Sequence, residues 1–367
     1  MNWSDIRLLH LEITSRCNSY CPSCSRYVGH SYELNKVIDN NQNWTLEQTK
    51  KRLPAEDLKN ISTYHFNGTV GDFCANSYAL EICQYLVENS DNPFVNINTN
   101  GSLRNKKWWG ELAKIKNIQV AFALDGMEDT HKLYRRETSW QKIIENSQEY
   151  IKQGGSAEWI MTIFKHNQHQ VEQCKKLSQE LGFSKFTTRF NDRRGGVLLD
   201  KNGNINGVLE QADNSPLKDI LGFIDEKQVK FFDRIEVKET KSLNLNPFTS
   251  LNDCPSFVRK EVYINSKWQV APCCHIGNVF FFRNRFIYDI ESSMQHVGLN
   301  LNLIEADDNR TVADIVNSGF NYATDHMLSN NILEICDHAC GKNTAFTIGR
   351  KTRDISLNNP NLDSLTP

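Results

Sequence analysis

Short runs rich in β-branched and aromatic residues alternate with helical patterns over about the first half of the 367-residue chain. Apolar residues recur at helical spacing between these runs, and Gly154 and Gly182 end two of the patterns. Alternating strands and helices predict right-handed βαβ units around a parallel sheet. Six units are too few for an eight-stranded barrel, so we expect an α/β fold with a partial (β/α)6 TIM-like barrel. The candidate strands are Leu8–Ile13, Ser62–Phe66, Phe94–Asn98, Gln119–Leu124, Trp159–Phe164 and Lys185–Phe190.

The pattern changes after the sixth strand. Residues Asn191–Pro216 are rich in Gly, Asn and Asp, which predicts a long loop or an interdomain connection. A helix at about Pro216–Glu226 and a strand at about Arg234–Glu239 follow. We expect three regions: a barrel over 1–235, a small α+β cluster-binding domain over 236–350, and a polar tail over 351–367.

Composition excludes several classes of protein. Hydrophobic residues make up 39% and charged residues 23% of the chain, as in globular proteins. The longest apolar runs, Gln119–Leu124 and Val279–Phe282, are too short to span a membrane. Residues 1–13 do not resemble a signal peptide, so we expect a cytoplasmic protein without a membrane partner. A net charge of −2 with short basic clusters does not favour nucleic-acid binding.

Eleven cysteines are unusual in a chain without an export signal. Disulfides are rare in the reducing cytosol, so clustered cysteines there indicate metal binding or catalysis. Three lie between positions 17 and 24, and five lie between positions 254 and 340. The other three, Cys74, Cys83 and Cys174, are scattered, and we interpret them as small buried apolar residues.

The first group, Cys17, Cys21 and Cys24, has the spacing C-x3-C-x2-C and directly follows the first predicted strand. This places the thiols at the carboxyl end of a barrel strand, where active sites of such barrels lie. Iron–sulfur cubanes usually take four thiolates, so three would leave one iron open to a small molecule. The alternative is a structural zinc site with His30 as the fourth ligand.

This motif resembles the signature of the radical S-adenosylmethionine (SAM) superfamily, and further similarities extend over about the first 190 residues. The stretch Phe66–Asp72 looks like a variant of the family's Gly-Gly-Glu motif. The stretches Ile97–Gly101 and Ala123–Gly126 are similar to family strand ends that line the SAM pocket. His131 and the Arg135-Arg136 pair follow at a spacing common after the fourth strand.

The resemblance implies a role for each matching residue. Cys17, Cys21 and Cys24 would hold the catalytic [4Fe–4S] cluster. Two departures from the family pattern are visible: Ser23 replaces the usual aromatic residue, with Tyr20 or Tyr27 as substitutes, and Val70-Gly71-Asp72 replaces Gly-Gly-Glu. The residues that would bind SAM are Tyr20, Gly71, Asp72, Asn98, Asn100, Asp125 and Arg135.

The later cysteines form a second group. A predicted β-hairpin near 262–271 would bring Cys254 and Cys273 together, while Cys336 and Cys340 are one helical turn apart. This arrangement resembles the twitch domain, a shortened SPASM-type extension, and implies an auxiliary [4Fe–4S] cluster held by these four thiolates. Cys274 is the alternative to Cys273. A closed zinc site and a disulfide network are the other interpretations.

The resemblance implies a radical SAM oxidoreductase. It would cleave SAM reductively to a 5′-deoxyadenosyl radical, abstract hydrogen from a substrate, and pass an electron to the auxiliary cluster, giving a net oxidation. Five late cysteines, fewer than in a two-cluster SPASM domain, favour a small-molecule substrate over a ribosomal peptide. A flavodoxin- or ferredoxin-type protein would donate the electron. A non-catalytic zinc- or Fe–S-binding protein is the alternative from another class.

Overall fold

The computed structural model describes residues 2–216, 223–224, 254–282 and 304–320. The described residues belong to two compact units. The first unit contains the described parts of 1–17, 35–96 and 234–347, and the second those of 18–34, 97–233 and 348–367. The loop that carries the first cysteine group therefore begins in one unit and continues in the other.

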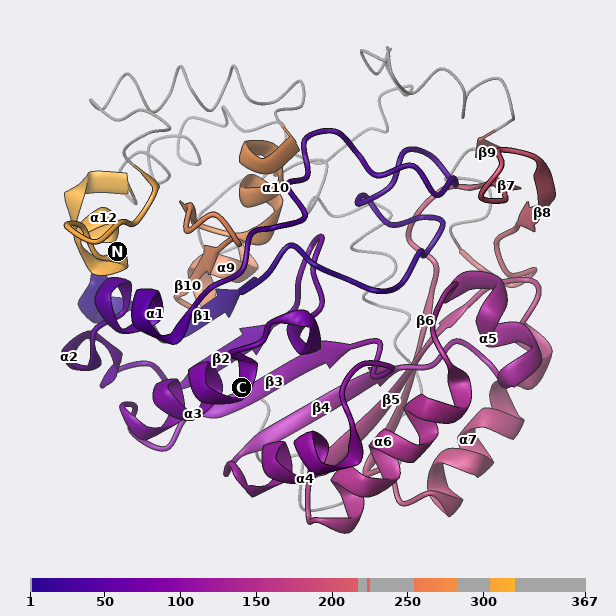
Figure 1. Ribbon diagram of the computed structural model, residues 1–367, viewed down its shortest axis with the longest axis horizontal. Coiled ribbons are helices and arrows are strands. Elements are labelled where there is room, and N and C mark those ends of the chain that lie inside the picture. The colour runs from indigo at the N-terminus through magenta and orange to yellow at the C-terminus, as the bar shows by residue number, and fades with distance from the viewer. Residues whose placement is uncertain (1, 217–222, 225–253, 283–303, 321–367) are drawn as a thin grey trace. The chain divides into compact units, whose positions relative to one another are not determined.

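In the first unit, β1 pairs parallel with β10 and with β2, and β10 pairs antiparallel with β11. In the second unit, β4, β5 and β6 form consecutive parallel pairs (Figure 1). All six predicted strands are present, and the α/β partial-barrel prediction is confirmed. Their bounds are β1 (Leu8–Leu11), β2 (Thr63–Phe66), β3 (Phe94–Thr99), β4 (Ile118–Ala123), β5 (Ser156–Ile163) and β6 (Lys185–Phe190).

Helices follow the strands as predicted, and polar residues begin several of them. The side chains of Thr45, Asn105 and Ser139 each accept a hydrogen bond from a backbone N–H in the first turn of their helix. Gly154 and Gly182 follow helices α6 and α7 with φ of +90° and +83°. These helices are α1 (Leu46–Arg52), α2 (Ala55–Leu58), α3 (Ala79–Glu88), α4 (Lys106–Lys114), α5 (Glu128–Tyr134), α6 (Trp140–Lys152) and α7 (Val171–Glu180).

Aromatic packing fixes the helices of the second unit against its strands. Phe122 of β4 lies 5.1 Å from Trp109 of α4 and 6.2 Å from Tyr150 of α6, measured between ring centroids. The Tyr150 hydroxyl donates to the Ile118 carbonyl at 3.0 Å. All three rings are fully buried, so this cluster forms a core between helices and sheet.

The prediction of a long loop over 191–216 is wrong. Residues Gly195–Leu199 (β7) and Ile205–Leu209 (β8) form an antiparallel hairpin. The Asp200 carboxylate organises its turn by accepting the N–H groups of Asn202 and Asn204, both at 2.8 Å. The expected helix at 216–226 is also wrong where it can be checked, because Phe223–Ile224 (β9) pairs with β7 as a strand.

The hairpin predicted near 262–271 is present and extends the sheet of the first unit. Strand β10 (Glu261–Ile264) pairs antiparallel with β11 (Val270–Ala271) and parallel with β1, where Tyr263 is opposite His10. Helices α9 (Pro255–Val258) and α10 (Cys274–Phe282) flank this hairpin, and α12 (Val312–Ile315) follows. The expected domain boundary at 235/236 and the strand at 234–239 lie outside the described residues, so the domain division stays a prediction.

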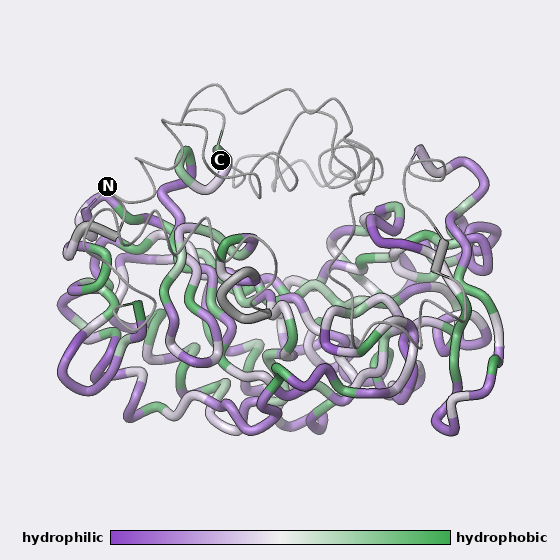
Figure 2. Tube along the Cα trace, turned by 90° about the horizontal axis from the view of Figure 1, so that it is seen from above, coloured by the Kyte–Doolittle hydropathy of each residue, from purple (hydrophilic) through white to green (hydrophobic). Residues whose placement is uncertain are grey.

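Hydrophobic segments are short and interrupted. Figure 2 shows hydrophobic stretches that alternate along the chain with hydrophilic ones. Within the described ranges, none of the helices combines the length and the apolar character needed to cross a membrane.

Candidate functional site

The first cysteine group lies in the loop after β1. Cys17 and Cys24 are half-buried, and Cys21 is 7% exposed. The Cys24 N–H donates to the Cys21 carbonyl, and the Tyr27 N–H donates to the Cys24 carbonyl, both at 3.0 Å. These successive turns fix the backbone around the second and third cysteines within the second unit.

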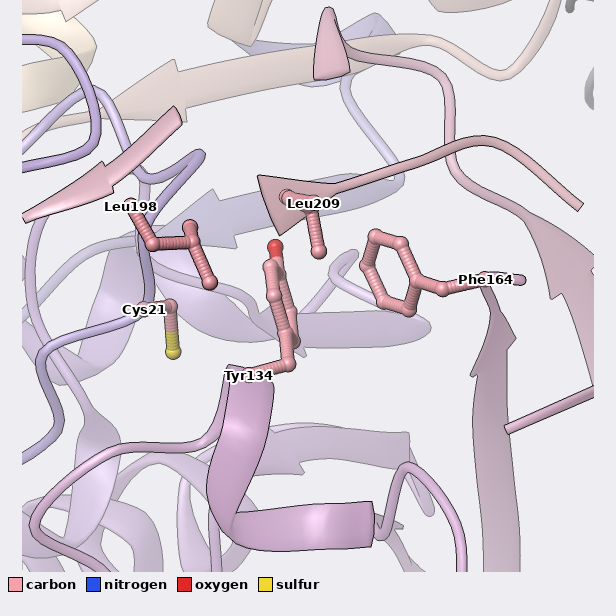
Figure 3. Close-up of a cluster of buried hydrophobic side chains, with 5 residues drawn as sticks. All are labelled: Cys21, Tyr134, Phe164, Leu198 and Leu209. Carbon is pink, nitrogen blue, oxygen red and sulfur yellow. The ribbon is translucent and has the colours of Figure 1, made fainter. Parts of the chain in front are cut away.

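Cys21 lies beside the Arg135 guanidinium and packs against a hydrophobic cluster. Its sulfur lies 3.6 Å from the Arg135 guanidinium and 3.0 Å from the Ser19 hydroxyl. Burial raises the pKa of the Cys21 thiol, and the charge of Arg135 opposes that rise. Figure 3 shows Cys21 beside Tyr134 and Leu198. The apolar cluster is completed by Phe164 and Leu209, with Cys24 packed against it.

Asp125, two residues after β4, holds Arg135 in place. Its carboxylate accepts the Arg135 Nε–H at 2.6 Å and the Thr162 N–H at 2.5 Å, and Asp125 is fully buried. Burial alone would raise the pKa of Asp125, but the Arg135 charge and these hydrogen bonds outweigh it and lower the pKa. The structure therefore groups three predicted residues, Cys21, Asp125 and Arg135, in the second unit.

Asn100 belongs to a small network of amides and a hydroxyl. Its Nδ2–H donates to the Asn18 side-chain oxygen at 2.9 Å, and its Oδ1 accepts the Ser102 hydroxyl at 2.8 Å. Asn18 donates in turn to the Ser102 oxygen at 2.8 Å. The sequence reasoning missed Asn18 and Ser102, although Asn18 directly follows Cys17. Asn98 lies half-buried within β3, one residue before its end.

Tyr20 stands in a group of three tyrosines. Its ring centroid lies 4.9 Å from that of Tyr27, in a stacked arrangement, and 5.0 Å from that of Tyr32. The Arg136 guanidinium lies 5.0 Å from the Tyr32 ring centroid. Both residues considered as substitutes for the missing aromatic residue therefore lie together, and Tyr32 is a third aromatic that the sequence pattern did not single out.

Gly71 and Asp72 follow β2 in the first unit. The buried Asp72 carboxylate accepts the Cys74 N–H at 3.0 Å and so begins a short 3-10 helix, Phe73–Ala75. The Asp72 N–H donates to the Arg16 carbonyl at 2.8 Å, which ties this loop to the residue before Cys17. Glu12, which the sequence reasoning missed, also binds this loop; an acidic residue directly after a buried strand was its only signal.

The second cysteine group is only partly described. Cys254, Cys273 and Cys274 are half-buried in the first unit. Burial alone would lower the pKa of His10, but a hydrogen bond with the Cys274 side chain and the Glu261 carboxylate outweigh it and raise the pKa to about 10. The Cys274 thiol therefore lies next to β1, the strand that carries His10. Cys336 and Cys340 lie outside the described residues, and the four-cysteine ligand set stays a prediction. The scattered Cys74, Cys83 and Cys174 are buried, as predicted.

No three His, Cys, Asp or Glu side chains in the described ranges lie close enough together to hold a metal ion. The three thiols of the first group are therefore ligands by prediction. Their chemistry fits an iron–sulfur cluster, because thiolates are its normal ligands and Arg135 compensates negative charge at Cys21.

Part of the chain is similar to a known protein family. Residues 11–177 match the family model described as the radical SAM superfamily. No curated protein matches the chain.

Among solved structures, Streptococcus suis SuiB bound to precursor peptide SuiA is 13% identical, with a TM-score of 0.53, and the match covers 91% of this chain and 72% of that one. SuiB in another structure is 13% identical with a TM-score of 0.48, and the match covers 75% of this chain but only 61% of that one. Native anSMEcpe with bound AdoMet is 17% identical with a TM-score of 0.45, over 73% and 74% of the two chains. Over residues 11–177 the chain is therefore similar to the radical SAM superfamily, a family that implies a [4Fe–4S] cluster and SAM.

Proposed function

We propose that this chain cleaves SAM reductively and abstracts hydrogen from a substrate, with Cys17, Cys21 and Cys24 as ligands of the [4Fe–4S] cluster. When bound, the cluster supplies the electron that splits SAM into methionine and a 5′-deoxyadenosyl radical. The observation that carries the proposal is the buried Cys21 thiol of a C-x3-C-x2-C loop, 3.6 Å from a guanidinium that is itself held by a buried carboxylate.

The chain's own residues prepare this site. Arg135 compensates the charge of the Cys21 thiolate, and Asp125 keeps the guanidinium oriented. The side chains of Tyr134 and Leu198 pack with Cys21 and limit its exposure to water. For SAM itself we propose contacts from Tyr20, Gly71, Asp72, Asn98 and Asn100, with Asp125 and Arg135 bordering the same ligand.

The direct experiment is anaerobic reconstitution with iron, sulfide, SAM and dithionite, followed by mass spectrometry of 5′-deoxyadenosine. We expect dithionite-dependent formation of 5′-deoxyadenosine and methionine. A reconstituted protein that carries the cluster but leaves SAM intact would contradict the proposal and favour a non-catalytic binding protein.

We also propose an auxiliary [4Fe–4S] cluster on Cys254, Cys273, Cys336 and Cys340 that accepts the substrate electron. The product would then be oxidised, by dehydrogenation or bond formation. Replacing Cys336 and Cys340 with Ala should remove about half of the iron while SAM cleavage continues, because four thiolates are normally needed per cubane. Formation of oxidised product at the wild-type rate by that variant would contradict the acceptor role.

The proposed substrate is a small molecule, and the electron donor is a flavodoxin- or ferredoxin-type protein in the cytoplasm. A second candidate substrate, a ribosomal peptide, is favoured by the SuiB structure, which contains a precursor peptide. Deuterium transfer into 5′-deoxyadenosine separates the two. Transfer from a deuterated metabolite extract supports the small molecule, and transfer from a deuterated peptide fraction alone supports the peptide.

A further inference from the structure

Glu12 is a buried carboxylate of the first unit that is hydrogen-bonded at both oxygens and that the proposed chemistry leaves unused. Its Oε1 accepts the N–H groups of Val70 at 2.6 Å and Gly71 at 3.0 Å. Its Oε2 accepts the hydroxyl of Tyr263 at 2.5 Å. Glu12 is 2% and Tyr263 1% exposed, so water does not replace these partners. The loop after β2 is thus attached to a carboxylate on the loop after β1.

The glycines of this loop leave no room for side chains. A Cβ on Gly68 would come within 2.3 Å of the Gly71 carbonyl oxygen, and one on Gly71 within 1.8 Å of the Thr14 carbonyl oxygen. Backbone therefore packs directly on backbone here, and only glycine fits at both positions. The N–H groups of this turn find their acceptor in Glu12, and the next N–H, that of Asp72, donates to Arg16.

Tyr263 reaches this loop from a distant part of the sequence. It lies on β10, opposite His10 of β1, and its hydroxyl also interacts with the side chain of Thr69 in the same loop. Without this hydroxyl, the buried Oε2 atom of Glu12 would lose its hydrogen-bond donor. An unsatisfied buried acceptor reduces the free energy of unfolding. Strand β10 leads through β11 to Cys273 and Cys274, so Tyr263 links that segment to the loop of Gly71 and Asp72.

We infer that Glu12 and Tyr263 are a positioning pair that fixes residues 68–72 in the conformation that binds SAM. The inference rests on the proposed SAM contacts of Gly71 and Asp72. It assigns to the segment before Cys273 a role in SAM affinity that is separate from any cluster it holds.

The test measures the dissociation constant of SAM by calorimetry on the anaerobically reconstituted protein, together with stability in urea. Tyr263→Phe removes the hydroxyl that Glu12 accepts. Tyr64→Phe is the matched control, because Tyr64 is equally buried on β2 and its hydroxyl bonds Ser90 at 2.6 Å instead. Glu12→Gln is the second variant, since an amide keeps the shape of the carboxylate but offers only one acceptor oxygen.

We expect both Tyr→Phe variants to lose similar stability, while only Tyr263→Phe weakens SAM binding, by about tenfold. Glu12→Gln should weaken it as well. Equal SAM affinities for wild type, Tyr263→Phe and Glu12→Gln would overturn the inference. Absence of SAM binding by the wild-type protein would instead overturn the proposed function, so the two failures are distinguishable.

Discussion

Two fully buried carboxylates follow parallel strands, Glu12 after β1 in the first unit and Asp125 after β4 in the second. Among the described residues, Glu12 accepts hydrogen bonds from two backbone N–H groups and the Tyr263 hydroxyl, with no ion pair. Burial raises the pKa of Glu12, and these donors and the charge of His10 offset the rise only in part. Asp125 has the Arg135 guanidinium, and its pKa is lowered. The first carboxylate fixes backbone geometry, whereas the second holds a positive charge beside a thiol.

This difference predicts that the largest loss of stability follows from a substitution in the Asp125–Arg135 ion pair. Arg135→Gln leaves Asp125 buried without its counter-charge, and breaking a buried ion pair typically costs about 3–5 kcal/mol. We expect a loss of unfolding free energy of this size in urea denaturation. The control is Lys165→Ala, which removes an exposed pair with Glu210 at 3.2 Å and should cost less than about 1 kcal/mol. Equal losses for the two variants would show that the Asp125 charge is not held by Arg135.

The same site predicts a dependence of stability on pH. His131 accepts the Asp125 N–H at 3.2 Å, and burial lowers the pKa of His131 to about 4. The unfolded chain, with a histidine pKa near 6.5, therefore binds more protons between these pH values, and stability falls as pH drops from about 6.5 to 4. His131→Gln should reduce this loss by about 3 kcal/mol in urea titrations at several pH values. An unchanged loss in the variant would mean that His131 is not held neutral.

The Glu12 site, which holds no ion pair, predicts the smallest loss of stability. Glu12→Gln keeps an acceptor for the backbone N–H groups, so we expect a stability loss of about 1 kcal/mol, the usual size for one hydrogen bond. A loss as large as that of Arg135→Gln would remove the distinction between the two carboxylates, since it would show that Glu12 stabilises the fold through its charge.

The sequence predicted the sheet well because each strand carries its own signal. The run Leu8–Leu11 is mostly apolar, Lys185–Phe190 is rich in phenylalanine and threonine, and the order of the strands requires crossover helices. The β7–β8 hairpin was missed because its glycines and asparagines are also typical of loops. Its strands are defined by pairing, as between Val197 and Val208, and not by periodicity.

The candidate site was predictable where it depends on local spacing and not where it depends on long-range contacts. The cysteine motif and the Asp125 and Arg135 positions could be read from the chain. The partners of Glu12 could not, because Tyr263 is 251 residues further along. Asn18 and Ser102 were missed for the same reason, since their interaction joins separate loops.

The central claim is that Cys17, Cys21 and Cys24 hold the cluster that cleaves SAM. The most direct test is 5′-deoxyadenosine formation by the anaerobically reconstituted triple Cys→Ala variant, measured by mass spectrometry beside Cys83→Ala, which changes a buried cysteine of α3. We expect no 5′-deoxyadenosine from the triple variant, about half of the iron retained because a second group of thiolates remains, and normal cleavage by Cys83→Ala. Formation of 5′-deoxyadenosine by the triple variant at the wild-type rate would contradict the claim.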